Sequence, residues 1–424
     1  MPDNNSLVFR KVWWLNPSYI VAVFLIPIYL LLWIAGIYTA GAISSAKSQY
    51  FFHGEYAFLG LLGLIFMYIG TLSPIKYKKR SSDRANNTVL VLNINVLTLL
   101  GCISIIGYIY WFKDIIFNPG LLISQIQSSA YISVRGAIER TAGIGSLAQI
   151  GLVYLMLFTY QSLLDKNKLT KNHYFLFYAI IVFIILRAFL WSERVALIEA
   201  MVAIIFIWAS YGSFKSAFLE KLLPFFPLMG GVFVVLFFGL GEFFRSWSSF
   251  YINQSIGFWE FIFQRLVNYY FEALNTGIGM LVTQEWPTYE FTHILAWLHK
   301  LPFIGGLFSF VIGVDVGLSS TYLSKYGDPE FNSSSGIFPV FLDIGIGAGL
   351  LFFFLIGVMS RYFYSMLEDR ICFYGIFYFL FLMIFLELFR YLYIGESRTF
   401  MIIIGFLLLT ITQKKIKFRN VVLP

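Results

Sequence analysis

The sequence predicts an all-α polytopic membrane protein with about ten transmembrane helices, and three observations lead to this fold class. Of the 424 residues, 59% are hydrophobic and 12% are charged, whereas soluble domains average roughly 45–50% and 25%. The apolar residues gather in runs of about 20, the length that crosses the hydrocarbon core of a bilayer. One long polar segment, from Gly241 to Gly336, interrupts the runs. We therefore interpret residues 1–424 as a single integral membrane domain in which 241–336 is a long loop between the seventh and eighth spans.

The apolar runs define the spans in chain order. The first run follows Arg10 and Lys11, so the start of the chain resembles a signal peptide, but the run is too long for one and is predicted to be a membrane helix. The polar sequence from Trp191 to Arg194 separates the fifth span from the sixth. The predicted spans are 18–39, 56–75, 88–111, 142–164, 173–191, 195–212, 222–240, 337–359, 371–393 and 399–413.

The loop charges predict the orientation. With both termini in the cytoplasm, the cytoplasmic segments hold more than half of the 30 lysines and arginines, although the external segments are longer in total. The net charge of +8 reflects this bias, and we expect no nucleic-acid partner. The loop 241–336 then lies outside. Because it is rich in aromatic residues, we expect it to form amphipathic helices on the membrane surface.

The sequence contains little that would bind a cofactor or a metal. The four histidines lack metal-ligand spacing, and Cys102 and Cys372 both lie inside apolar runs. Neither a phosphate-binding loop nor a paired-carboxylate nucleotide-sugar motif occurs. We therefore expect no cofactor and no metal, and any transferase activity would use a donor carried by a lipid.

Arginines are concentrated on the predicted external side. Arginine within a span is costly and usually faces a cavity and an anionic partner, and its planar guanidinium suits phosphate. Two pairs of arginines, Arg187 with Arg194 and Arg390 with Arg398, each lie at a tight external turn between two spans. Local pairing with Glu193 and Glu396, or contact with lipid headgroups, would explain the same positions. The arginines concerned are Arg135, Arg140, Arg187, Arg194, Arg245, Arg265, Arg390 and Arg398.

Within the long loop, Arg265, Asn268, Glu272 and Asn275 form a polar stripe at helical spacing. The stripe could be one wall of a cleft that offers a cation, a carboxylate and amides to a polar ligand. It could equally be the solvated face of an interfacial helix, with Arg265 and Glu272 loosely paired.

Several external residues are candidates for proton transfer. Imidazole suits general base catalysis near neutral pH, although a histidine among aromatics can also be a packing residue. Asp343 begins the eighth span, and an intramembrane carboxylate is a candidate functional residue that could also pair with an arginine. The candidates are His293, His299, Glu272, Glu242 and Asp343.

The second half of the chain, from Arg187 to Arg361, resembles the Wzy-type oligosaccharide repeat-unit polymerases of the O-antigen polymerase family. The resemblance rests on short motifs in a fixed order. They are Ser192-Glu-Arg194 followed by Val-Ala-Leu-Ile, Gly241-Glu-Phe-Phe-Arg245 at the start of the loop, Leu301-Pro302, Ser333-Ser-Ser-Gly336, and Asp343-Ile-Gly345 entering the next span.

The resemblance implies a GT-C-like glycosyltransferase of the bacterial inner membrane, a multi-pass protein whose active site faces the periplasm. Such an enzyme moves a growing glycan from undecaprenyl pyrophosphate to a new lipid-linked repeat unit. The expected partners are undecaprenyl-pyrophosphate-linked glycans and the lipid bilayer, and a chain-length regulator protein is left open.

The same resemblance assigns roles to residues of this chain. Arg194, Arg245, Arg390 and Arg398 would bind pyrophosphate, and Arg265 would be catalytic by stabilising charge as the glycosidic bond breaks. His293 is the first choice for the residue that accepts the acceptor proton, and Glu272 is the second. Asp343 and Arg187 are further site candidates.

Two alternatives stay open at this point. An O-antigen ligase would have the same architecture and arginines but would transfer the glycan to the lipid A core. A polysaccharide flippase or other transporter would instead place charged residues through the middle of many spans, with short loops on both sides. This chain concentrates its charge around one long external loop.

Overall fold

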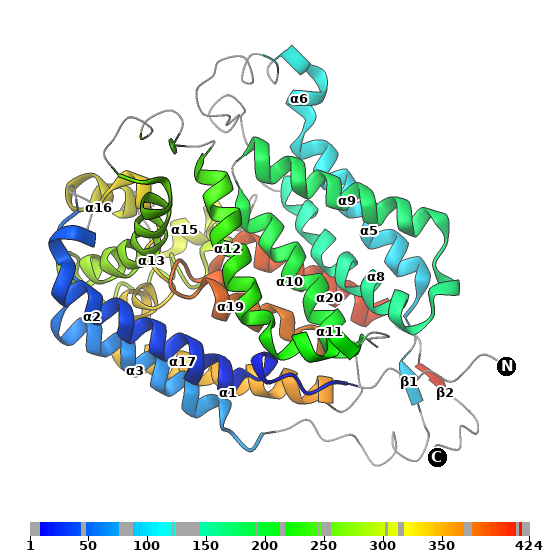
Figure 1. Cartoon of the computed structure of the whole chain (residues 1–424), viewed down its shortest axis with the longest axis horizontal. Coiled ribbons are helices and arrows are strands. Elements are labelled where there is room, and N and C mark those ends of the chain that lie inside the picture. The colour runs from blue at the N-terminus through cyan, green and yellow to red at the C-terminus, as the bar shows by residue number, and fades with distance from the viewer. Residues whose placement is uncertain are drawn as a thin grey trace.

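A computed structural model describes most of the chain (Figure 1). The described residues are 9–43, 48–75, 88–90, 92–120, 123, 144–191, 193–212, 217–243, 246–247, 251, 256–301, 304–312, 318–368, 375–412 and 415–417. Within these ranges the protein is helical except for two short antiparallel strands, β1 (Thr88–Leu90) and β2 (Lys415–Lys417).

Eight helical segments of the described chain are long and apolar enough to cross a membrane, which supports the prediction of a helical membrane protein. The main helices of these segments are α2 (Ile26–Ile43), α3 (Gly54–Thr71), α5 (Ile94–Trp111), α8 (Ile150–Leu164), α9 (Lys171–Leu190), α10 (Arg194–Tyr211), α12 (Phe226–Glu242) and α17 (Phe338–Glu368). A short helix α1 (Pro17–Tyr19) and a π-helical turn (Ile20–Leu25) precede α2, and a 3-10 turn (Ile144–Gln149) precedes α8.

The predicted bounds are too long at two of the ten spans. The ninth, predicted over 371–393, is longer than the helix α19 (Tyr378–Glu387), whereas α20 (Ser397–Thr412) agrees with the tenth; both helices are shorter than 18 residues. The third span begins at Ile94, because Thr88–Leu90 pairs with β2 instead of extending α5.

Capping side chains set where several helices begin. The side chain of Asn16 accepts a hydrogen bond from the backbone of Ser18, and Pro17 starts the helix. Asn93 caps α5 in the same way. At the start of α9, Thr170 and His173 form a reciprocal capping box. These polar residues lie between apolar runs, so they end one span and begin the next.

The helices alternate in direction between two ends of the molecule. At the terminal end, the backbone N–H of Arg10 donates to Ser210 at the end of α10, and β1 meets β2. At the loop end lie α13 (Phe258–Thr283), α14 (Ala296–His299), α15 (Ile304–Ile312) and α16 (Leu318–Tyr326). Figure 1 shows α13, α15 and α16 on the opposite side from β1 and β2. Arg10 near the start of the chain and Lys417 near its end therefore lie at the same end of the bundle, away from these helices.

Close backbone contact holds α3 against α17. A Cβ atom on Gly70 would clash with the carbonyl oxygen of Phe354, and one on Gly357 would clash with that of Met67. Small residues allow membrane helices to approach closely, where packing and not the hydrophobic effect drives association. The loop-end helix α13 packs against both helices of this pair.

The long loop is only partly a set of surface helices. In α13, every residue from Phe271 to Leu281 is buried, so the expectation of an interfacial helix is wrong for this half of α13. The expectation fits α15 better, because Leu307, Phe310 and Val311 are exposed. A helix buried on all sides must satisfy its polar side chains within the protein, and this determines the positions of Glu272 and Asn275.

Candidate functional site

Four of the predicted arginines are gathered at the loop end, each beside a carboxylate. We call this set the arginine–carboxylate cluster; it contains Arg194, Arg265, Arg390 and Arg398 with Glu199, Glu242, Glu330 and Glu387. The members come from α10, α12, α13, the α16–α17 connection, α19 and α20. Because these segments are far apart in the chain, only the tertiary fold brings the charges together.

Glu242 joins two of the arginines at the end of α12. Its Oε1 lies 2.5 Å from a terminal nitrogen of Arg194, and its Oε2 lies 2.8 Å from Nε of Arg265. The hydroxyl of Ser246 donates to the same carboxylate at 2.5 Å. Arg265 also pairs with Glu330 at 2.9 Å. Two guanidinium groups from different helices therefore converge on one buried anionic group.

The other two arginines lie next to the turn between α19 and α20. Arg390 pairs with Glu387 at 3.1 Å and donates to the hydroxyl of Tyr269 at 3.0 Å. Arg398 pairs with Glu199 at 2.9 Å, and the hydroxyl of Tyr393 donates to the same oxygen of Glu199. Glu199 is fully buried in α10, so its charge depends on these partners.

Aromatic rings connect the arginines. Tyr269 lies edge-on to Phe238 and Phe331, with ring centroids 6.2 and 6.1 Å apart. Arg194 lies over the Phe238 ring at 4.9 Å, and Arg265 lies over the Phe331 ring at 5.5 Å. Such contacts orient guanidinium groups and favour their charge. Three arginines, including the one bonded to Tyr269, therefore surround one aromatic group.

The carboxylates keep the guanidinium groups charged despite burial. Burial lowers the pKa of Arg265, but Glu242 and Glu330 raise it by more, so the net pKa lies above the ordinary value. Arg390 is likewise held beside a carboxylate, with Glu387 at 3.1 Å. These side chains therefore act as permanent cations.

Three buried polar atoms of the cluster have no hydrogen-bond partner among the described residues. They are Nε of Arg390, the hydroxyl of Tyr391 and Oε2 of Glu199. Arg390 lies over the Tyr391 ring at 5.3 Å, and Tyr391 stacks on Tyr393, whose hydroxyl donates to Glu199, so the three groups lie close to one another. Buried polar groups are almost always bonded. A donor, a hydroxyl and an acceptor are thus available here to a polar ligand.

His293 and Asp343 form a second polar unit at the loop end. Nδ1 of His293 lies 3.0 Å from Oδ1 of Asp343. The other oxygen of the carboxylate accepts from the backbone N–H groups of His293 and Ile294, at 3.0 and 2.8 Å. Asp343 is fully buried, whereas the His293 side chain is 19% exposed. A carboxylate on Nδ1 selects the tautomer whose Nε2 can accept a proton.

A break in α17 positions Asp343. Gly345 has φ of 78° and ψ of 178°, which interrupts the helix just after Asp343. The carbonyl oxygens of Leu342 and Asp343 are then free of helical bonds and accept from the backbone of Thr288 and Tyr289, both at 2.9 Å. The segment that carries His293 is in this way bonded to the break.

The histidine unit lies beside the turn that leads to Arg398. A Cβ atom on Gly395 would clash with the carbonyl oxygen of His293. Trp297 stacks on Phe400 of α20, with ring centroids 4.6 Å apart and planes 8° from parallel. The backbone of Ser335 and Gly336 also lies against Leu388 and Tyr391. Two of the quoted motifs, Ser333-Ser-Ser-Gly336 and Asp343-Ile-Gly345, thus lie near the turn between α19 and α20.

Two other predicted residues lie elsewhere. Arg187 is buried, pairs with Glu193 at 2.5 Å and lies over Trp111 at 4.0 Å, which is the local pairing left open above. Glu272 is buried and accepts from the hydroxyl of Ser48 at 2.7 Å. The expected pairing of Arg265 with Glu272 is replaced by its pairs with Glu242 and Glu330. Residues 135, 140 and 245 fall outside the described residues, so the pyrophosphate role predicted for Arg245 has no structural description.

Sequence reasoning missed Glu330 and Glu387 as partners of the arginines. Glu387 could have been found, because a carboxylate at the end of an apolar run needs a cation. Glu330 could not have been found in this way, because it lies in a polar segment where a carboxylate needs no buried cation. In the part of the chain that the structure describes, no three His, Cys, Asp or Glu side chains come together as a metal site would need.

Asn275 is expected to be a structural residue. Its side chain accepts from the backbone N–H of Phe51 and Phe52, at 2.6 and 3.0 Å, and donates to the carbonyl of Gln49 at 2.8 Å. Asn275→Leu would leave these buried backbone groups unpaired and should lower the free energy of unfolding by about 2–4 kcal/mol. Thermal unfolding in detergent measures the loss. Asn268→Leu on the same helix is the control and should change it little.

Comparison of the chain with protein-family models, with curated proteins and with solved structures finds no match. The fold and the site therefore define a class in physical terms: a helical membrane protein with buried arginine–carboxylate pairs and a histidine–aspartate unit at one end.

Proposed function

We propose that this protein polymerises undecaprenyl-pyrophosphate-linked oligosaccharide repeat units at its loop end. The growing glycan is transferred to a new lipid-linked repeat unit, and the lipid pyrophosphate leaves. One observation carries the proposal: four arginines with fixed partners lie at the same end of the bundle as a histidine whose Nδ1 is held by a buried carboxylate. A glycosyl transfer from a diphosphate needs both cations and a base.

In the proposed reaction, a hydroxyl oxygen of the acceptor sugar attacks the anomeric carbon of the donor glycan. The bond between that carbon and the pyrophosphate oxygen breaks, and its electron pair leaves with the pyrophosphate. Nε2 of His293 accepts the hydroxyl proton, and Asp343 stabilises the imidazolium that forms. Displacement in one step inverts the configuration at the anomeric carbon.

The arginines would stabilise the charge that develops on the leaving pyrophosphate. Glu242 lies between Arg194 and Arg265, with one carboxylate oxygen 2.5 Å from a nitrogen of Arg194 and the other 2.8 Å from Nε of Arg265, so the two guanidinium groups are already spaced to share one anion. Pyrophosphate oxygens would replace or share the carboxylate contacts. Such preorganised cations need little rearrangement when the bond breaks.

The location follows from the same proposal. The loop end would face the periplasm and the lysine-rich terminal end the cytoplasm, in the inner membrane of a bacterium. The lipid-linked donor and acceptor would both enter from the bilayer, and a chain-length regulator protein would contact the enzyme from outside the site.

The test is polymerisation by purified protein with a synthetic undecaprenyl-pyrophosphate repeat unit. We expect a ladder of polymers from the unmodified protein and a loss of about 10²–10³-fold in rate with Arg265→Ala, because one charge-stabilising group is removed. Arg361→Ala is the matched control, since Arg361 pairs with Glu368 at 3.9 Å near the end of α17 remote from the loop.

Each other outcome has a defined meaning. A ladder from Arg265→Ala at the unmodified rate would remove Arg265 from the site. Transfer only to the lipid A core would make the protein a ligase. Absence of any transfer with the native repeat unit would contradict the enzyme assignment and favour transport.

A further inference from the structure

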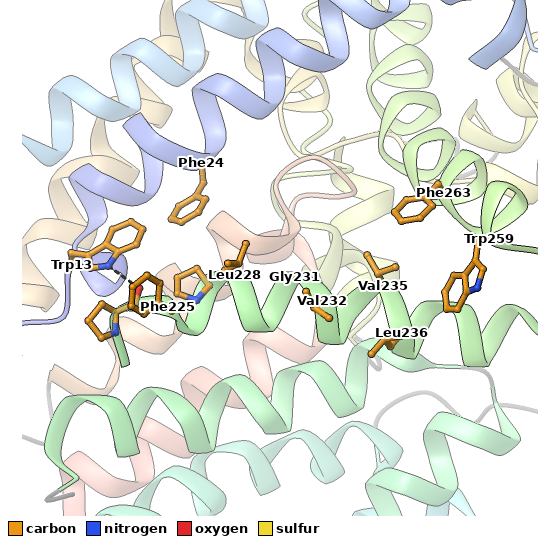
Figure 2. Close-up of a pocket in the computed structure, with 12 residues that line it drawn as sticks. Trp13, Phe24, Phe225, Leu228, Gly231, Val232, Val235, Leu236, Trp259 and Phe263 are labelled. Carbon is orange, nitrogen blue, oxygen red and sulfur yellow. Dashed lines mark hydrogen bonds between the residues drawn. The ribbon is translucent and has the colours of Figure 1, made fainter. Parts of the chain in front are cut away.

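An apolar groove runs along α12 (Figure 2). Its volume is about 700 Å³, within the range of ligand pockets. Trp13 and Phe24 lie on one side of it, and Trp259 and Phe263 of α13 lie at its other end. The remaining lining residues belong to α12 and the turn before it: Pro224, Phe225, Pro227, Leu228, Gly231, Val232, Val235 and Leu236.

The groove has the length of an extended hydrocarbon chain segment. From Pro224 to Leu236 a helix rises by about 18 Å at ~1.5 Å per residue, more than half of the ~30 Å hydrocarbon core. Only 17% of an 18-residue window of the 220–242 span is buried inside the protein. Most of this helix is therefore exposed on the outside of the bundle, where lipid can contact it. Leu228 and Val232 are 71% and 57% exposed.

One end of the groove leads to the arginine–carboxylate cluster. On α12, Leu228, Val235 and Glu242 recur at a spacing of seven residues and so lie on one face of the helix. The next turn after the groove packs on α13, because a Cβ on Gly239 would lie 3.7 Å from Ile262. Glu242 and its two arginines, Arg194 and Arg265, therefore lie on the same face of α12 as the groove, about 9 Å beyond Leu236 at ~1.5 Å per residue.

We propose that this groove holds the polyprenyl chain of the lipid-linked substrate, with the diphosphate at Arg194 and Arg265. The proposal rests on the proposed function. Charge complementarity selects this occupant: an apolar channel with cations at one end matches an amphiphile with one long apolar chain and an anionic head. The side chain of Trp13 donates to the carbonyl of Pro224 at 3.0 Å and marks the other end of the groove (Figure 2).

Two adjacent glycines provide a matched test. Gly231 lines the groove, whereas Gly230 does not. A Cβ at either position would meet nothing within 4 Å, so the backbone at both positions accepts a side chain equally well. Gly231→Phe should fill the groove, and Gly230→Phe should place the same side chain on a different face of the same helix.

The measurement is the binding of undecaprenyl diphosphate to purified protein in nanodiscs, with inorganic diphosphate as a second probe. We expect Gly231→Phe to weaken binding of the lipid by about 10-fold or more, as loss of a filled apolar pocket does. Gly230→Phe should bind the lipid as the unmodified protein does. Inorganic diphosphate should bind all three proteins equally.

Equal lipid binding by the two variants would overturn the groove proposal. So would equal competition by phosphatidylglycerol, because the groove would then hold ordinary bilayer chains. The assay measures binding and not transfer, so these failures are distinct from failure of the proposed function, which a missing polymer ladder from the unmodified protein would show.

Discussion

His293→Ala is expected to lower kcat for polymerisation by about 10²–10⁴-fold, the contribution of a positioned general base. The reason is geometric. Asp343 holds Nδ1 of His293 at 3.0 Å, which leaves Nε2 as the proton acceptor beside the turn that carries Arg398. Because a base acts in the transition state and contributes little to ground-state binding, KM should change far less than kcat.

The control is the other histidine of the same segment. His299 contacts the hydroxyl of Ser309 at 2.9 Å and the carbonyl of Glu290 at 3.1 Å, so His299→Ala should leave kcat nearly unchanged. Asp343→Asn should lower kcat with a smaller change in KM: the amide oxygen would take the two backbone N–H groups, so the amide NH2 would face Nδ1 and favour the tautomer with the proton on Nε2. If His293→Ala keeps kcat within a few-fold while the protein stays folded, the base lies elsewhere.

Arg398→Ala is expected to give the largest loss of stability, about 3–5 kcal/mol, since it leaves a buried carboxylate without its cation. Glu199 is fully buried, and Arg398 lies 2.9 Å from it. Thermal unfolding in detergent should show a lower melting temperature. The same variant should also lose polymerase activity.

A double variant separates the structural part of this loss from the functional part. Arg398→Ala with Glu199→Gln removes both charges and should recover much of the stability, because no unpaired charge stays buried. Activity should stay low if Arg398 binds pyrophosphate. Recovery of both stability and activity would contradict that role and would make the pair purely structural.

Local sequence alone determines that this chain forms membrane-spanning helices. Apolar runs of membrane-spanning length predict helices because the bilayer leaves the backbone of a span no hydrogen-bond partners other than its own. For the same reason the break at Trp191–Arg194 and the start of α17 could be predicted. The strand at Thr88–Leu90 could not, because its partner is Lys415–Lys417 at the other end of the chain.

Residue types and the side of the bundle on which they lie could also be predicted, but their partners could not. The arginines and His293 were expected at the loop end from hydropathy and charge alone. That Arg265 pairs with Glu242 and not Glu272 depends on how α12 packs on α13. His293 meets Asp343 only because α17 breaks at Gly345 and the preceding segment bonds to the break. Hydropathy is a property of each segment, whereas a buried charge is satisfied by whichever segment the tertiary packing brings beside it.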